Sequence, residues 1–328
     1  MNIHIPLYRP DLAIIDEQIL LAQLARAPFQ DAGLLTRWEN LWERLWNRYA
    51  VAFARHDEAV MQLKRLLGWS SGATVLTDPL LDPVWREALH AAWLHTALRD
   101  VEPRSGCASG PPEASHPCTL MLHHPFGLPA TPIPAPVILE EISSVLQPLP
   151  GVGHGLIQLV NLEGPRILPV GSGCVLLSTD AALMTALARQ RLRPPGAAAC
   201  ALGCALLENL PQRLQRRREL AERYLSLLRL DTMATPPHNP ASGRSWESFF
   251  LTLKDPEVRT GLESFLVKAN IGCGSPLWFP PPEELPGVRR FLRHTLALPL
   301  YAALSDGECK RIINRLHRWV ERAWLPPK

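Results

Sequence analysis

The stretch TLMLHHPFGLPATPIPAPVILEEISSVLQPLPGVGHGLIQLVNLEGPRILPVGSGCVLLSTDAAL, residues 119–183, decides the fold. It contains four short apolar runs separated by turn-forming residues, at 119–124, 135–141, 154–160 and 173–178. Apolar runs of this length with Gly- and Pro-rich turns between them are typical of buried strands. Because helical patterns alternate with these strands along the chain, we expect an α/β protein with a mainly parallel sheet covered on both faces.

The residues before this stretch supply further alternating elements. Helical apolar spacing at 14–26 and 37–49 is followed by a short strand at 50–53 and a second strand at 73–76. Asp82-Pro83 is a typical helix start, because a carboxylate accepts free N–H groups of the first turn and proline fits its first position. The sequence predicts that this helix runs to about Leu98.

The character of the chain changes near Thr232. A long helical region at 197–228 ends there, and a linker-like loop at 236–244 follows. A strand, a helix and a proline-rich loop come next, and Ser305 with Glu308 forms a capping box for the last helix. We therefore predict a large domain over residues 1–230 and a small C-terminal α+β domain over residues 231–328.

Composition excludes several classes of function. The chain has 328 residues, of which 47% are hydrophobic and 20% charged, as in ordinary globular proteins. Its net charge of +3 is too small to indicate a nucleic-acid partner. No apolar run is long enough to predict a membrane span, and the N-terminus lacks a signal-peptide pattern. The seven cysteines form no regular frame, so we expect reduced thiols and a cytoplasmic protein.

Lysine is scarce in this chain. It occurs at five positions, and none of them falls between residues 65 and 253, although the chain holds 34 lysines and arginines in total. Any chemistry that needs a primary amine in the middle of the chain therefore has no lysine to supply it.

Six segments resemble, in the same order, motifs of the DegT/DnrJ/EryC1/StrS sugar aminotransferase family. They are IPLYRPDL (5–12), HPFGLPA (124–130), VILEEISS (137–144), GSGCVLLSTDAAL (171–183), LPQRLQRRRELAERYLSLL (210–228) and LALPLYAALSDGE (296–308). The resemblance covers nearly the whole chain. It implies the fold-type-I fold of enzymes that use pyridoxal phosphate (PLP), with a large domain, a small C-terminal domain and active sites built by two subunits.

The resemblance also places the family's active-site positions on this chain. Counting back from Gly171, Arg166 falls where the family has the lysine that forms a Schiff base with PLP. That step requires an amine able to lose its proton, whereas a guanidinium stays protonated and is a poor nucleophile. Glu141 falls where the family has the aspartate that pairs with the pyridine nitrogen, and Ser144 where it has glutamine or histidine.

The segment that resembles the family's phosphate-binding turn is altered as well. The family has Ser-Gly-Thr at this turn, whereas here the strand at 50–53 is followed by Ala54, Arg55, His56, Asp57 and Glu58, so the glycine that allows close backbone approach is absent. Asp57 suits a helix cap rather than a phosphate ligand. No aromatic residue is present in the turn after the strand at 73–76 to stack on a cofactor ring. We therefore expect that PLP is not bound, although the family implies it.

The resemblance implies that seven residues lie near one another at the carboxyl ends of the strands, the edge where open α/β sheets bind ligands. They are Arg55, His56, Asp57, His124, Glu141, Ser144 and Arg166. Two interpretations are open. Arg55 and Arg166 could hold a carboxylate or phosphate, or Arg166 could form a buried ion pair with Glu141; the second is favoured, because an unpaired buried charge is costly.

The histidine pair His123-His124 and the glutamate pair Glu140-Glu141 do not predict a metal site. Adjacent residues of a strand point to opposite faces, so only one member of each pair can enter the site. Two ligands are too few for a metal, and none is expected. Trp38, Trp42 and Trp46 recur at helical spacing and indicate either core or a subunit interface.

The resulting functional hypothesis is an aminotransferase-like pseudoenzyme. It would act as an interaction or regulatory subunit in sugar or cell-surface polysaccharide metabolism, as a homodimer or a dimer with a homologue. One alternative is a protein that binds a small-molecule ligand, an anion or a sugar, in the remodelled pocket. The other is a divergent sugar-modifying enzyme that uses PLP or pyridoxamine phosphate (PMP) without a lysine.

Overall fold

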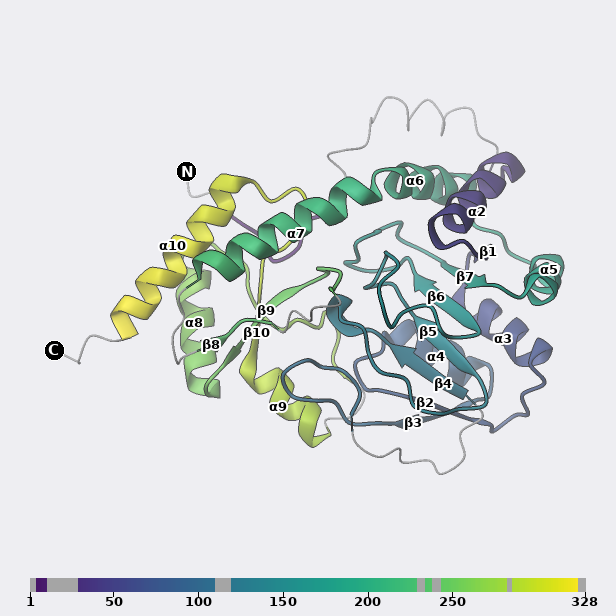
Figure 1. Cartoon of the computed structure of the whole chain (residues 1–328), viewed down its shortest axis with the longest axis horizontal. Coiled ribbons are helices and arrows are strands. Elements are labelled where there is room, and N and C mark those ends of the chain that lie inside the picture. Colours follow the sequence, from purple (N-terminus) through teal and green to yellow (C-terminus); the bar gives the residue numbers. More distant parts are fainter. Residues whose placement is uncertain are drawn as a thin grey trace.

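A seven-stranded sheet forms the centre of the large domain (Figure 1). The computed structural model describes residues 4–10, 29–109, 119–228, 234–237, 243–281 and 285–323. The strands are β1 (Tyr49–Phe53), β2 (Thr74–Thr77), β3 (His95–Leu98), β4 (Thr119–His123), β5 (Ile138–Glu141), β6 (Ile157–Asn161) and β7 (Cys174–Ser178), in the order β1-β7-β6-β5-β4-β2-β3. Only β7 is antiparallel to its neighbours. The predicted mainly parallel sheet is confirmed.

Helices cover both faces of this sheet, as the alternating pattern predicted. One face packs against α3 (His56–Leu66), α4 (Pro83–Ala91) and α5 (Ala181–Gln190), and the other against α2 (Ala32–Trp46) and α6 (Ala197–Glu208). Alternate residues of each strand divide between the two cores: Phe53 of β1 joins the first and Ala52 the second. None of the helices in these described ranges is both long and apolar enough to span a membrane.

The tryptophan-rich helix α2 belongs to the interior of its own chain. Trp38, Trp42 and Trp46 are all buried and pack in the core between α2 and α6. Trp38 lies so close to Gly203 of α6 that a Cβ at that glycine would come within 2.5 Å of the indole. Of the two interpretations of these tryptophans, the structure selects core, so they provide no apolar surface for a subunit interface.

The helix that begins at Pro83 is shorter than expected. It ends at Ala91 rather than near Leu98, and residues His95–Leu98 form β3 instead. Trp93 reverses the chain in a left-handed conformation with φ 57°, and β3 then pairs in parallel with β2. Ala97 and Leu98, which favour helices, therefore adopt a strand, because pairing along the sheet edge outweighs a weak local preference.

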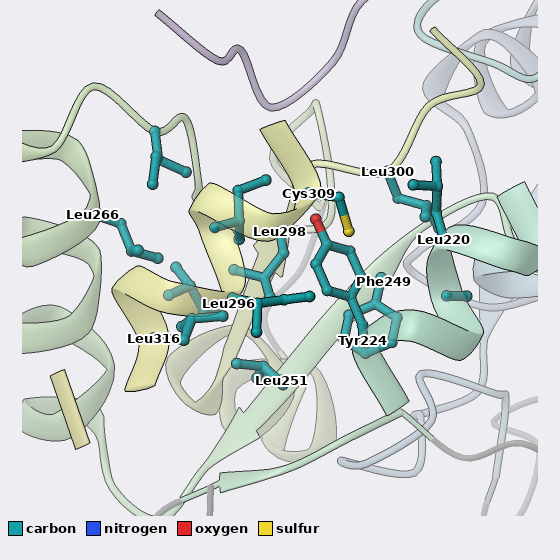
Figure 2. Packing of buried hydrophobic residues seen from close by; sticks show 14 of the residues in the cluster. Leu220, Tyr224, Phe249, Leu251, Leu266, Leu296, Leu298, Leu300, Cys309 and Leu316 are labelled. Carbon is teal, nitrogen blue, oxygen red and sulfur yellow. The ribbon is translucent and has the colours of Figure 1, made fainter. Parts of the chain in front are cut away.

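The small domain has a three-stranded antiparallel sheet and its own core (Figures 1 and 2). Its core holds Leu220, Tyr224, Phe249, Leu251, Leu266 and Leu296 among others (Figure 2). Its elements are β8 (Ala234–Thr235), β9 (Phe249–Leu253), α8 (Pro256–Lys268), α9 (Pro286–His294), β10 (Thr295–Leu298) and α10 (Asp306–Ala323). The capping box is present: the Ser305 hydroxyl donates to Glu308, and the N–H of Glu308 donates back. This arrangement confirms the expected small α+β domain.

One helix joins the two domains. The helical region 197–228 consists of α6 and α7 (Leu210–Leu227), which meet at Asn209. Leu210 packs in the core of the large domain, whereas Tyr224 packs in that of the small domain. The predicted boundary at residue 230 and the predicted helix at 14–26 lie outside the described residues.

A tight turn brings the two domains into contact. The turn η1 (Pro125–Gly127) follows β4, and its Gly127 has φ 82°. The N–H of Ser245 donates to the Gly127 carbonyl at 2.8 Å, and the Arg244 guanidinium donates to that of Phe126 at 2.7 Å. This contact holds residues 243–248 of the small domain against the carboxyl edge of the large sheet, which places Glu247 there.

Candidate functional site

Arg166 lies at the carboxyl edge of the large sheet, in the loop between β6 and β7, and is only 7% exposed. Its Nη2 donates to Oδ2 of Asp82 at 2.6 Å, and its Nη1 donates to Oε1 of Glu247 at 3.0 Å. The same Nη1 also donates to the Ser144 hydroxyl at 3.2 Å. The guanidinium is therefore held by two carboxylates, one from each domain.

The expected buried ion pair exists, but its predicted partner is wrong. Glu141, at the end of β5, instead accepts the hydroxyl of Ser143 and its N–H at 3.4 Å. Asp82 reaches Arg166 because α4 begins at this edge of the sheet. Glu247 reaches it because residues 243–248 lie at the same edge. From its place before Pro83, Asp82 is expected only as a helix cap, and it also has that role because it accepts the N–H of Val84. Glu247 is not among the residues predicted for the site.

The surrounding charges keep Arg166 protonated. Burial by itself lowers the pKa of its guanidinium, but the charges of Glu247, Glu141 and Asp82 outweigh burial and raise that pKa well above its ordinary value. A protonated guanidinium has no lone pair that could attack a carbonyl carbon. This position can bind and neutralise carboxylates, but it cannot supply an amine nucleophile.

His56 is linked to the same network through an asparagine. The Oδ1 of Asn161 lies 3.0 Å from Nε2 of His56, and its Nδ2 donates to Asp82 at 2.8 Å. Burial lowers the pKa of His56 to about 4, against a smaller opposing contribution from the hydrogen bond to Asn161. His56 is therefore neutral at pH 7. Asn161, the last residue of β6, was not predicted as a site residue; its place at the carboxyl end of a strand was the available signal.

Of the two adjacent histidines, the structure places His123 in the site and His124 elsewhere. His123 lies 3.3 Å from Asp78; burial opposes its protonation, but the charges of Asp78 and Glu141 prevail and raise its pKa. His124 accepts the N–H of Ala130 at its Nδ1 and packs on the other side of β4. As expected, only one of the two adjacent histidines enters the site. That histidine is His123, whereas the resemblance implied His124.

Arg55 and Asp57 lie apart from Arg166. The two side chains pair with each other at the surface, with Arg55 Nε donating to Asp57 Oδ1 at 2.9 Å. Arg55 is the N-cap residue of α3 and makes no side-chain capping bond, so the expected cap at Asp57 is wrong: Asp57 belongs to the first helical turn. Its carboxylate is neutralised locally by the arginine two residues before it.

Two separate cavities flank the network. A cavity of about 150 Å³ between the domains is lined by His123, Ser144, Arg166, Glu247, Trp278 and Phe279 among others. A second, of about 350 Å³, is lined by Arg55, His56, Asp57, Glu87 and Glu163 among others. Arg55 and Arg166 thus open onto different cavities. Among the residues whose side chains are described, no three His, Cys, Asp or Glu form a metal-binding group.

Part of this chain is similar in sequence to known aminotransferases. The sequence pattern of the DegT/DnrJ/EryC1/StrS aminotransferase family matches residues 197–317. Over that segment, which is less than half of the chain, the protein is similar to this family. A dTDP-4-dehydro-2,3,6-trideoxy-D-glucose 4-aminotransferase from Saccharopolyspora spinosa is 29% identical over 131 residues, which are 37% of this chain and 34% of that protein. The matched stretch thus spans about a third of that relative's length.

Solved structures of aminotransferases match almost the whole chain. PseC of Helicobacter pylori, an aminotransferase involved in the biosynthesis of pseudoaminic acid, has a TM-score of 0.83 and 14% identity over 98% of this chain and 100% of that one. The putative sugar aminotransferase Spr1654 from Streptococcus pneumoniae, in its PLP-form, has a TM-score of 0.81 and 14% identity over 98% and 100%. These likenesses establish the fold, and Spr1654 is also known in a PMP-form.

Proposed function

We propose that this chain is a non-catalytic member of the DegT/DnrJ/EryC1/StrS family that does not bind PLP. The observation that carries the proposal is the buried guanidinium of Arg166, which is fixed by Asp82 and Glu247. The resemblance places the family's Schiff-base lysine at this residue. A lysine amine at that place would have to be free to lose its proton and attack an aldehyde. Arg166 is instead committed to a structural ion pair that joins the two domains.

The residues at the phosphate-binding turn support the same proposal. The cavity beside this turn is lined by three carboxylates, those of Asp57, Glu87 and Glu163, and by one arginine, Arg55, which is already paired with Asp57. A phosphate group needs N–H donors and positive charge instead. The space between the domains, about 150 Å³, is also below the roughly 300–1,000 Å³ of usual ligand pockets. The residues present therefore do not fit PLP.

The first prediction concerns cofactor binding. After incubation with excess PLP and desalting, we expect no visible absorption band and no cofactor by mass spectrometry. The variant Arg166→Lys should behave in the same way, because Asp57, Glu87 and Glu163 still surround the phosphate position. A PLP-binding member of the family, treated in parallel, controls for cofactor loss. A stable band in the wild-type protein would contradict the proposal and favour the lysine-independent PLP or PMP enzyme.

A chain without the catalytic lysine and without PLP would act as an interaction or regulatory subunit. The resemblance to sugar aminotransferases supports a role in sugar or cell-surface polysaccharide metabolism. The alternative of an anion-binding pocket at the old active site needs Arg55 and Arg166 to act together. They open onto different cavities, and both are already paired with carboxylates. A neutral sugar-like ligand in the cavity between the domains stays the second candidate, because Trp278 and Phe279 line that cavity.

The second prediction is that the chain forms a homodimer or pairs with a homologue. Because the α2 tryptophans are buried, support comes instead from the resemblance to a family in which two subunits build each active site. Light scattering at micromolar concentration should give the mass of two chains, or of one chain with a co-purified homologue. A monomer that persists in the presence of a family member from the same source would contradict it.

A further inference from the structure

A basic cleft lies beside β8 and β9 of the small sheet, and its described lining residues are all different from those of the cavity at the Arg166 network. The cleft has a volume of about 410 Å³ and is bounded by the turn after β3, the edge strand β8, the central strand β9, and α9. Four basic side chains line it, those of Arg104, Lys254, Arg290 and His294. The only carboxylate among the described residues that line it, Glu102, accepts the N–H groups of Arg104 and Ser105 in its own turn.

Three of these basic side chains have no carboxylate partner in the part of the chain that the structure describes. Across the described ranges, no carboxylate lies within ion-pair distance of Arg104, Lys254 or Arg290. Arg166, Arg191 and Arg216, by contrast, each have such a partner. Three permanent positive charges around one concave surface repel one another, so a bound anion would relieve that repulsion.

The walls of the cleft are fixed relative to one another. Asp100 accepts the N–H groups of Gly287 and Val288 at 2.7 and 3.2 Å, which ties the chain before the turn to the start of α9. A Cβ at Gly287 would come within 2.1 Å of the Val101 carbonyl oxygen, so this contact requires glycine. At the other end of α9, His294 Nδ1 lies 3.0 Å from the Leu253 carbonyl of β9. Backbone contacts therefore hold the segments that carry the basic side chains in fixed positions relative to one another.

We propose that this cleft binds a compound with two or more linked phosphate groups. The number of basic groups exceeds what one phosphate, with its charge of roughly −1.5 to −2, would neutralise. The volume of about 410 Å³ falls in the range of small-molecule pockets, roughly 300–1,000 Å³. Arginine and lysine are the usual phosphate ligands, and Thr235 and Thr252 add hydroxyl groups to the wall. The ligand chemistry is the same for free diphosphate and for the diphosphate of a nucleotide.

Isothermal titration of the full-length protein with inorganic diphosphate, at low ionic strength and without divalent cations, tests this proposal. We expect saturable binding that the double variant Lys254→Gln/Arg290→Gln weakens by roughly tenfold or more. Arg293→Gln is the matched control, because Arg293 is exposed on the same helix but does not line the cleft; it should change the affinity by less than about twofold. Thermal unfolding verifies that each variant is folded.

A parallel titration with a nucleoside diphosphate separates the two sources of the group. Tighter binding than that of inorganic diphosphate assigns the site to a nucleotide, and equal or weaker binding assigns it to free diphosphate. The proposal is overturned if millimolar diphosphate gives no saturable heat, or if Arg293→Gln weakens binding as much as the double variant. Neither result bears on PLP, since the cleft shares no residue with the Arg166 network.

Discussion

Replacing Arg166 by methionine is expected to lower the free energy of unfolding by about 3–5 kcal/mol. The substitution leaves Asp82 and Glu247 without their counter-charge in a place where Arg166 is 7% exposed and Asp82 only 1%. Removing one partner of a buried pair costs far more than the pair itself contributes, because a charge that stays behind keeps its full desolvation penalty.

A double-mutant cycle identifies the partner. Glu247→Gln alone should also destabilise, whereas Arg166→Met combined with Glu247→Gln should cost less than the sum of the two, by about 0.5–3 kcal/mol. The matched cycle with Glu141→Gln should show a smaller coupling, because Glu141 makes its hydrogen bonds to Ser143. Arg55→Met serves as the control for an exposed arginine and should leave the denaturant midpoint unchanged. Equal coupling to Glu141 would mean that the pair was wrongly assigned.

Replacing Gly127 by alanine is the second change with a large expected effect, about 4 kcal/mol or more, or failure to fold. A Cβ at this position would lie 1.5 Å from the carbonyl oxygen of Ser245, which is backbone and cannot move aside as a side chain could. The Gly127 backbone also has φ 82°, a conformation that other residues rarely adopt. Relief of the overlap requires separation of the two domains.

The control Gly72→Ala isolates the cost of the backbone conformation. Gly72 has almost the same φ, 81°, but the nearest atom to its added Cβ, on the His95 ring, is 3.8 Å away. Its substitution should therefore cost only the left-handed strain, about 1–2 kcal/mol. Urea unfolding of both variants decides the matter. Similar losses for the two would show that strain alone, and not the contact with Ser245, makes Gly127 necessary.

The fold could be predicted from the sequence because its signals are local and repeated. Apolar runs of strand length, helix caps such as Asp82-Pro83 and the box at Ser305 and Glu308 each depend on residues close together in the chain. The predictions failed or stayed open where contacts between residues far apart in the chain determine the structure. Ala97 and Leu98 favour helices but lie in β3, because that segment pairs with β2. The α2 tryptophans are buried because they pack against α6.

The candidate site could be predicted only in part, for the same reason. The resemblance put Arg166, Ser144 and Glu141 at one sheet edge, and strand alternation required one histidine of the pair to point inward. The carboxylates that contact Arg166 come from residues 243–248 and from the residue before the first turn of α4. The spacing of residues within one motif predicts neither contact. Tertiary geometry, rather than residue type, selected Asp82 and Glu247.

The continuous helix α7 limits how the protein can move. Its first turns are anchored by Leu210 in one core and its last by Tyr224 in the other, with no break between them. Two domains that share an unbroken rod cannot hinge freely at their junction; any relative rotation must bend the rod or unwind one of its ends, and must also separate Arg166 from Glu247. We therefore expect the two domains to move together as one body, and the surface that they form to keep a constant shape.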